Sequence, residues 1–194
     1  MKEKSPCRFI TFTGRPGSGK STIIKNVLLV RPDLQMFSGK SVTTRPQRKG
    51  DVLGEYLHVT PQEFAGMDKV GEFLWTAEQE STGYRYGTRR MDVDRTLRGR
   101  KKSVMTLVPE AVDSLREYVG AERMLSFFIH VPVDTLARRM IEYRGDEPEK
   151  AFARLQETVT WTQSLDMVIV ANISEEEPPA QTATESVLKV LSKC

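Results

Sequence analysis

The chain has 194 residues, of which 39% are hydrophobic and 28% charged, and its formal net charge is +3. This composition is typical of a globular protein with one substantial core, and so small a charge does not demand a nucleic acid as partner. No apolar run approaches the roughly 20 residues of a membrane span, and the first residues lack the hydrophobic stretch of a secretory signal. We therefore expect a cytoplasmic protein, monomeric or homodimeric, with neither a membrane nor a nucleic acid as partner.

Cysteine and histidine are too scarce to suggest a metal centre. Cys7 and Cys194 lie near opposite ends of the chain, and the only histidines are His58 and His130. A reduced pair of thiols is favoured, with a disulfide as the open alternative. His130 lies in an apolar run, which favours a strand residue over a metal ligand.

The first predicted elements are a buried strand over residues 9–13 and a helix over 22–29, joined by a glycine-rich loop. The loop, residues 14–21, fits the phosphate-binding pattern G-x-x-x-x-G-K-[ST] in the required strand–loop–helix context. Its glycines let successive N–H groups turn toward phosphate oxygens, and the helix N-terminus adds a favourable dipole. We expect a nucleoside triphosphate to be bound by Gly14, Gly17, Ser18, Gly19, Lys20, Ser21 and Thr22.

Within this loop, two side chains have distinct predicted roles. Lys20 can reach the terminal phosphates and stabilise the charge that develops on the transferred group. The Ser21 hydroxyl can join the coordination shell of Mg²⁺. The loop alone therefore predicts a nucleoside triphosphate and Mg²⁺, but leaves the second substrate open.

The elements that follow alternate in type. Residues 38–88 are rich in glycine, threonine, arginine and short β-prone pieces, which predicts a small inserted lobe. In it a helix begins at Pro61, with Thr60 as N-cap and Glu63 in the capping-box position, and residues 71–77 form a strand. After the lobe we expect helices over 89–98, 109–118, 134–143, 148–162 and 180–191, and strands over 103–108, 125–131 and 167–171. This order predicts an α/β fold whose mainly parallel sheet has helices on both faces, with nucleotide at the carboxyl ends of the strands.

The inserted lobe contains a second candidate anion site. Arg45 and Arg48 lie three residues apart in a segment broken by Pro46, so they can converge on one anion. The planar guanidinium matches phosphate oxygens in a bidentate manner. Residues 83–88 add phenol and hydroxyl groups beside a glycine turn. Taken separately, each piece is a weak signal, and a T-T-R-P-x-R run is more often a solvated loop.

Taken in order, these pieces resemble the guanylate kinase family. The phosphate-binding loop is followed by S-V-T-T-R-P-x-R-x-G-[DE]-V and a tyrosine, then by Y-G-T, and residues 136–155 resemble the lid of that family. The run before Tyr56 is one residue shorter than the usual one. The resemblance covers nearly the whole chain and implies the P-loop kinase fold. It also implies three parts: a core of residues 1–37, 89–133 and 166–194, an acceptor-binding lobe of 38–88 and a helical lid of 134–165.

The resemblance also implies the site residues and the reaction, which is ATP-dependent phosphoryl transfer to GMP or dGMP. Lys20, Arg45, Arg144 and Arg154 would be catalytic, and phosphoryl transfer needs little beyond in-line placement and positive charge. Thr88 would contact guanine, and Arg139 would join the lid arginines over the triphosphate. The acceptor monophosphate would be held by Ser41, Arg45, Arg48, Tyr56 and Tyr86.

Two departures from the family bear on the base. Guanylate kinases usually have a glutamate where this chain has Trp75, and Glu78 could take that role after a register shift. The strand over 104–108 has no acid where the family usually has one, and Glu110 is the nearest. A buried donor of the base left without an acceptor costs about 1–3 kcal/mol, so guanine would be poorly discriminated unless one of these glutamates substitutes.

Three alternatives stay open beside this interpretation. A sugar-phosphate kinase similar to the ribose 1,5-bisphosphate kinases would also lack these acids, although Arg48 favours a nucleotide. A protein-binding module of the same fold without activity would not need Lys20 or the lid arginines. A nucleic-acid interface over residues 89–102 is disfavoured, because its basic residues alternate with acids and no aromatic residue lies among them.

Overall fold

The computed structural model describes residues 7–47, 56–79, 82–142, 145, 147–157, 167–173 and 180–193, except the side chains of 154 and 157. Its larger sheet has five parallel strands in the order β2–β7–β1–β8–β9. These strands are β1 (Phe9–Thr13), β2 (Leu34–Met36), β7 (Lys102–Thr106), β8 (Met124–His130) and β9 (Val168–Ala171). The central strand β1 is fully buried, as its apolar sequence requires.

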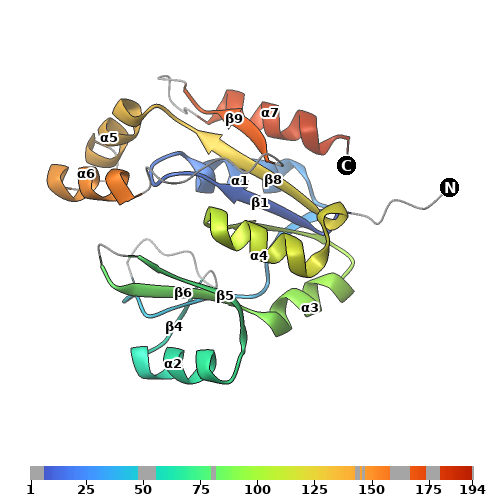
Figure 1. Ribbon diagram of the computed structural model, residues 1–194. Coiled ribbons are helices and arrows are strands. Elements are labelled where there is room, and N and C mark those ends of the chain that lie inside the picture. Colours follow the sequence, from blue (N-terminus) through green and yellow to red (C-terminus); the bar gives the residue numbers. More distant parts are fainter. Residues whose placement is uncertain are drawn as a thin grey trace.

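Helices cover both faces of this sheet (Figure 1). On one face, α1 (Lys20–Val30) and α7 (Gln181–Leu191) pack in a cluster that includes Ile10 and Phe12 of β1. On the other, α3 (Arg90–Arg98) and α4 (Pro109–Val119) pack in a cluster that includes Phe9 of β1. A short 3₁₀ helix, Ala121–Arg123, leads into β8. The α/β fold with a mainly parallel sheet is therefore confirmed.

A second sheet has four strands in the order β4–β3–β6–β5. Its strands are β3 (Ser41–Thr43), β4 (Tyr56–His58), β5 (Phe73–Gln79) and β6 (Tyr84–Arg89), and α2 (Pro61–Lys69) packs on it. We call these elements the inserted lobe. Figure 1 shows α2 on the side of this sheet that is turned away from the larger sheet. The other face of the small sheet is therefore turned toward the core.

The start of α2 shows how local sequence sets an element. The Thr60 hydroxyl accepts from the backbone N–H of Glu63, and the Glu63 carboxylate accepts from the backbone N–H of Thr60. Pro61 follows at the first helical position. The predicted capping box is thus present, and its hydrogen bonds from Thr60 lower the pKa of Glu63.

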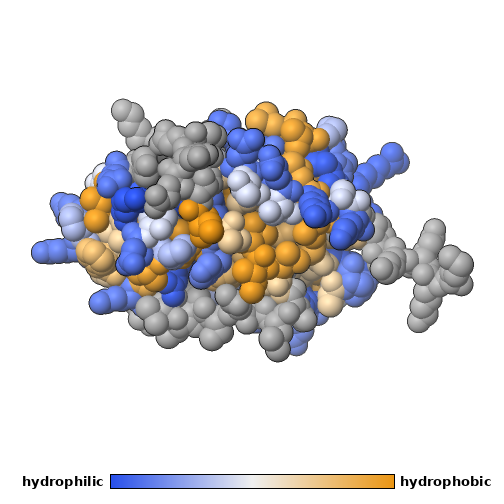
Figure 2. All heavy atoms as spheres, turned by 90° about the horizontal axis from the view of Figure 1, so that it is seen from above, coloured by the Kyte–Doolittle hydropathy of each residue, from blue (hydrophilic) through white to orange (hydrophobic). Residues whose placement is uncertain are grey.

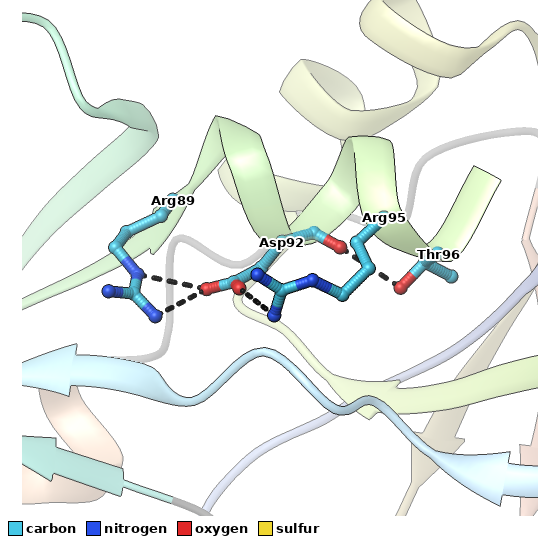
Figure 3. Close-up of polar contacts among 4 residues, drawn as sticks. All are labelled: Arg89, Asp92, Arg95 and Thr96. Atoms are coloured by element: carbon cyan, nitrogen blue, oxygen red, sulfur yellow. Dashed lines mark hydrogen bonds and ion pairs between the residues drawn. The ribbon is translucent and has the colours of Figure 1, made fainter. Parts of the chain in front are cut away.

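The chain crosses between core and lobe at two places beside Asp92. Figure 3 shows the polar contacts of Asp92 with Arg89, Arg95 and Thr96. The chain enters the lobe through residues 37–40, where a side chain on the buried Gly39 would collide with Asp92 and with Phe37. It returns where β6 ends and α3 begins. There Asp92, only 1% exposed, accepts from Arg89 at 2.9 Å and from Arg95 at 3.2 Å. We call Gly39, Arg89, Asp92 and Arg95 the junction.

Two further helices, α5 (Val133–Glu142) and α6 (Pro148–Glu157), pack against each other beside the carboxyl ends of β1 and β8. Their shared cluster includes Leu136 and Met140 of α5 and Leu155 of α6. The predicted helix over 148–162 is described as far as Glu157. The division into core, lobe and lid stays a prediction.

Seen from the side of α7 and β9, the surface carries apolar side chains in the middle of the face, bordered by hydrophilic ones (Figure 2). β9 is an edge strand, and its Ile169 is 53% exposed.

Among the described helices, none is both long and apolar enough to span a bilayer.

Candidate active site

The loop between β1 and α1 has the backbone of a phosphate cradle. Gly14, Gly17 and Gly19 all have positive φ angles, of 150°, 80° and 85°. A side chain on Gly14 would place its Cβ 2.6 Å from the carbonyl oxygen of Ile129, and one on Gly19 would lie 2.6 Å from Asn172 Nδ2. The loop therefore needs glycine both for its backbone conformation and for close packing. Such a conformation turns N–H groups inward, as an anion site requires.

The side chain of Lys20 is held over this loop by carbonyl oxygens of the loop backbone. Its Nζ donates to the carbonyl oxygens of Gly14 at 2.6 Å and Arg15 at 3.0 Å, and to Ser18 Oγ at 3.3 Å. The ammonium group is therefore fixed at the cradle before a ligand arrives, which reduces the ordering cost of binding phosphate. Ser21 and Thr22 follow in the first turn of α1, and both are exposed. Their hydroxyls are available at the positive end of the helix.

A residue that sequence reasoning missed supports this loop from β9. Asn172 follows the end of β9 and is 2% exposed, and its Nδ2 donates to the carbonyl oxygen of Ser18 at 2.8 Å. Its Oδ1 is buried and has no hydrogen-bond partner within the described ranges. One feature of the sequence could have pointed to Asn172. It is a polar residue directly after the last strand of a parallel sheet, at the edge where ligands bind.

Arg139 of α5 joins the same arrangement. Its side chain is buried, and Nη2 donates to the backbone carbonyl oxygen of Asn172 at 3.2 Å. Met140, the next residue, lies against Gly17 of the loop. The first of the predicted lid arginines therefore lies at the back of the phosphate-binding loop, linked to it through Asn172.

Arg45 is a buried cation directly after β3 of the inserted lobe. It is 5% exposed, and its guanidinium lies 4.9 Å from the centre of the Tyr56 ring. Its backbone is fixed as well, because its N–H donates to Thr43 Oγ1 and its carbonyl oxygen lies 2.7 Å from His58 Nδ1. A buried guanidinium held in this way is suited to a phosphate, since anion binding compensates its lost hydration.

The pairing of the strands brings four more predicted residues to one face of the lobe. Ser41 lies opposite Tyr56, Thr43 lies opposite Tyr86, and β6 carries Tyr86 and Thr88 two residues apart. Paired residues point to the same side of a sheet, as do residues two apart on a strand. We call this face, which is turned toward the core, the acceptor face. It carries Ser41, Thr43, Tyr56, His58, Trp75, Tyr86 and Thr88.

Glu78 does not lie on the acceptor face. It pairs with Arg85, whereas Trp75 pairs directly with Thr88, and 78 and 75 therefore point to opposite sides. Arg85 points to the α2 side, where it forms an ion pair with Asp68 at 2.6 Å. The register thus places the Glu78 carboxylate on the side of α2, opposite the side on which Trp75 and Thr88 lie. A bulge between 73 and 75 does not change this outcome.

Three predicted residues cannot be placed. Arg48 and Arg144 lie outside the described residues, and the side chain of Arg154 does too, although its backbone belongs to α6. Glu110 is exposed in the first turn of α4.

The phosphate-binding loop, the order of the parallel strands and the inserted lobe together define a P-loop kinase fold. The family model described as guanylate kinase matches residues 7–180. Similar proteins include the guanylate kinase of Bacteroides fragilis, 33% identical over 191 residues, covering 96% of this chain and 89% of its own. That of Thermus thermophilus is 32% identical over 174 residues, covering 87% and 76%. The chain belongs to the guanylate kinase family.

Solved structures agree on the fold. A guanylate kinase from Anaplasma phagocytophilum superposes with a TM-score of 0.62 at 23% identity, covering 98% of this chain and 87% of its own. A gluconokinase from Sinorhizobium meliloti superposes with a TM-score of 0.52 at 16% identity, covering 98% and 97%. At these identities the likeness concerns the fold alone.

Proposed function

We propose that this protein is an ATP-dependent nucleoside monophosphate kinase that phosphorylates GMP and dGMP. The observation that carries the proposal is the presence of two anion-binding arrangements in one chain of this family. One is the loop around Lys20, and the other is the acceptor face around Arg45. Two phosphorylated substrates repel each other, so a kinase must supply positive charge on both sides of the transferred group.

The residues of the donor side have separable roles. The loop glycines and Lys20 bind the phosphates of ATP, and Lys20 stabilises the charge on the transferred phosphoryl group. The exposed Ser21 hydroxyl suits Mg²⁺, which neutralises phosphate charge when bound. Arg139 and Asn172 position the loop from behind. Arg144 and Arg154 are proposed to complete the site on closure and exclude water.

On the acceptor side, Arg45, Arg48, Tyr56, Tyr86 and Ser41 hold the monophosphate, and Thr88 meets the base. No residue is assigned as a general base, because a phosphate oxygen is already a nucleophile at neutral pH. The role of the protein is to align two bound substrates. We also propose a cytoplasmic protein, monomeric or homodimeric, that acts on small nucleotides without nucleic acid or membrane as partner.

A second function is favoured by one specific observation. Among the described residues of the acceptor face none is a carboxylate, so no charged group there accepts hydrogen bonds from the edge of guanine. A sugar phosphate similar to ribose 1,5-bisphosphate has no base, so it would not need a hydrogen-bond acceptor at this position.

One experiment separates these functions. The protein is incubated with Mg·ATP and GMP, dGMP, AMP, CMP, UMP or ribose 1,5-bisphosphate in turn, and ADP release is measured. We expect turnover with GMP and dGMP. Turnover with the sugar phosphate alone would establish the second function. Folded protein that binds ATP and uses no acceptor would contradict both.

A further inference from the structure

Trp75 stands where the acceptor face meets the core. It pairs directly with Thr88, so its ring lies on the same face as Thr88 and Tyr86. The indole also packs against the core cluster formed by β7, α3 and α4, which contains Met105 and Leu107. Trp75 therefore lies between the residue proposed to meet the base and the carboxyl end of β7.

The indole Nε1 of Trp75 is buried and has no hydrogen-bond partner in the described part of the chain. Indole can only donate, so this N–H calls for an acceptor. An unmet buried donor is costly, and native structures rarely keep one without a reason. A ligand atom that accepts this hydrogen bond would provide such a reason.

The carboxylates described near Trp75 are turned away from it or already paired, and Asp92 is bound by Arg89 and Arg95. Glu78 lies on the opposite side of the sheet, across from Arg85. The described residues of β7 include no acid, and Glu110 is exposed in α4. The polar groups that remain close to Trp75 in the sheet are hydroxyls, foremost that of Thr88. The described polar groups at the proposed base site are therefore the indole N–H and hydroxyls, none of them a carboxylate.

Building on the proposed kinase function, we infer that Trp75 determines specificity and that the acceptors are 6-oxopurine nucleoside monophosphates as a class. The indole N–H donates to the carbonyl oxygen of the base. The exocyclic 2-amino group, which guanine has and hypoxanthine lacks, is itself a donor. The indole N–H therefore gains no hydrogen bond from it. Adenine presents an amino donor in place of that carbonyl oxygen and is disfavoured, because two donors would then face each other.

This inference makes GMP and IMP near-equivalent acceptors. A site that accepted a hydrogen bond from the 2-amino group with a carboxylate would reject IMP by about 10–100-fold or more. We expect the ratio of kcat/KM for GMP to that for IMP to stay below about tenfold, one hydrogen bond to a charged group being worth at least that factor. Both should exceed AMP by more than this factor.

The test compares the wild type with Trp75→Phe, which keeps an apolar ring and removes the N–H. We expect kcat/KM for GMP and IMP to fall together by about tenfold, with the preference over AMP reduced and the KM for ATP unchanged. Trp75→Glu adds an acceptor and should raise the GMP/IMP ratio. Glu78→Gln and Glu110→Gln serve as matched controls that leave this ratio unchanged. Thermal unfolding identifies any variant that does not fold, and Trp75→Phe carries the test if Trp75→Glu fails.

Three results would overturn the inference. A wild-type GMP/IMP ratio above about tenfold would show that an acceptor reads the 2-amino group. An unchanged GMP/AMP ratio in Trp75→Phe would show that the indole N–H does not contact the base, and a fall of the GMP/IMP ratio in Glu110→Gln would assign the reading to that glutamate. Turnover with none of the nucleotides would instead contradict the proposed function, so the two failures are distinguishable.

Discussion

The phosphate-binding loop and the acceptor face place their polar side chains by different means. The loop is one contiguous run, in which Lys20 contacts the carbonyl oxygens of residues that precede it by only five or six positions. The acceptor face is assembled from four short strands, so Ser41 and Thr88 come together only through strand pairing. The comparison teaches that donor chemistry is encoded locally, whereas acceptor chemistry depends on register. A shift of one residue on β5 would exchange the sides of Trp75 and Glu78.

The largest expected effect lies in the loop. Lys20→Ala should lower kcat by about 10²–10³-fold, because a fixed positive charge at the transferred phosphoryl group is lost. The measurement is the rate of ADP release at saturating ATP and GMP. Lys25→Ala, on an exposed position of the same helix, should stay within about twofold of the wild type. A comparable loss in both variants would show that the effect is not specific to the loop.

On the acceptor side, Arg45→Ala should raise the KM for the acceptor by about 10–100-fold, as expected for the loss of a charged hydrogen bond. The KM for ATP should stay unchanged, which separates the two halves of the site. Arg45→Lys keeps the charge, loses the planar fork and should have an intermediate effect. Arg85→Ala is the control, because Arg85 lies on the α2 side of the same sheet. An equal loss of ATP affinity in Arg45→Ala would place this arginine in the donor site.

The junction joins the two regions, and Asp92→Asn tests it. The change keeps the shape of the side chain and removes its charge, leaving Arg89 and Arg95 without their buried partner. Unfolding in urea should show a loss of about 1–3 kcal/mol, below the range for fully buried pairs because both arginines are partly exposed. Asp113→Asn breaks an exposed pair with Arg116 and should cost less than about 1 kcal/mol. Equal losses in both would contradict a structural role for the buried pair.

A smaller effect is expected at the start of α2, far from either substrate. Thr60→Ala removes the N-cap hydroxyl and should lower the free energy of unfolding by about 1 kcal/mol. Activity with saturating substrates should not change. Thr182→Ala, within the exposed part of α7, should cost no more than about 0.5 kcal/mol. A loss of activity in Thr60→Ala would mean that the geometry of the acceptor face depends on the stability of α2.

The pH dependence of the same cap is the smallest expected effect. Hydrogen bonds from Thr60 lower the pKa of Glu63 below its ordinary value of 4.5. The unfolded chain therefore binds this proton first, so the stabilisation is present above pH 4.5 and disappears as pH falls through the folded-state pKa. The free energy of unfolding is measured in urea at pH 7 and in acid. Its change between the two pH values should be smaller for Thr60→Ala than for the wild type. An identical difference would show that the Thr60 hydroxyl does not contribute to this titration.

Much of the fold could be predicted because its signals are local. The strand Phe9–Thr13 and the capping box of Thr60 and Glu63 are observed as predicted, since periodicity and capping act within a few residues. The short strand Leu34–Met36 was missed because three residues are too few for a period. Residues 83–88 are predicted only to place phenol and hydroxyl groups beside a glycine turn, so the strand that begins at Tyr84 is not predicted, although Gly83 does have a positive φ directly before it.

The candidate site likewise has one part that could be predicted from the sequence and one part that could not. Lys20 and its loop follow from eight consecutive residues, but the contact between Asn172 and Ser18 joins positions 154 residues apart. The side of the sheet on which Glu78 lies is set by the pairing of β5 with β6, and the length of the intervening turn does not reveal it. Long-range pairings of this kind leave little trace in a single sequence.

The junction also has an evolutionary meaning. Because the chain enters and leaves the inserted lobe beside a single residue, Asp92, the lobe can be exchanged as one segment without rethreading the parallel sheet. A lineage could therefore keep its donor machinery and change its acceptor by substitution or replacement within residues 38–88. Grafting this lobe onto another P-loop kinase of the same fold, with Gly39 and Asp92 kept, would test whether acceptor choice moves with the lobe while ATP use stays with the host.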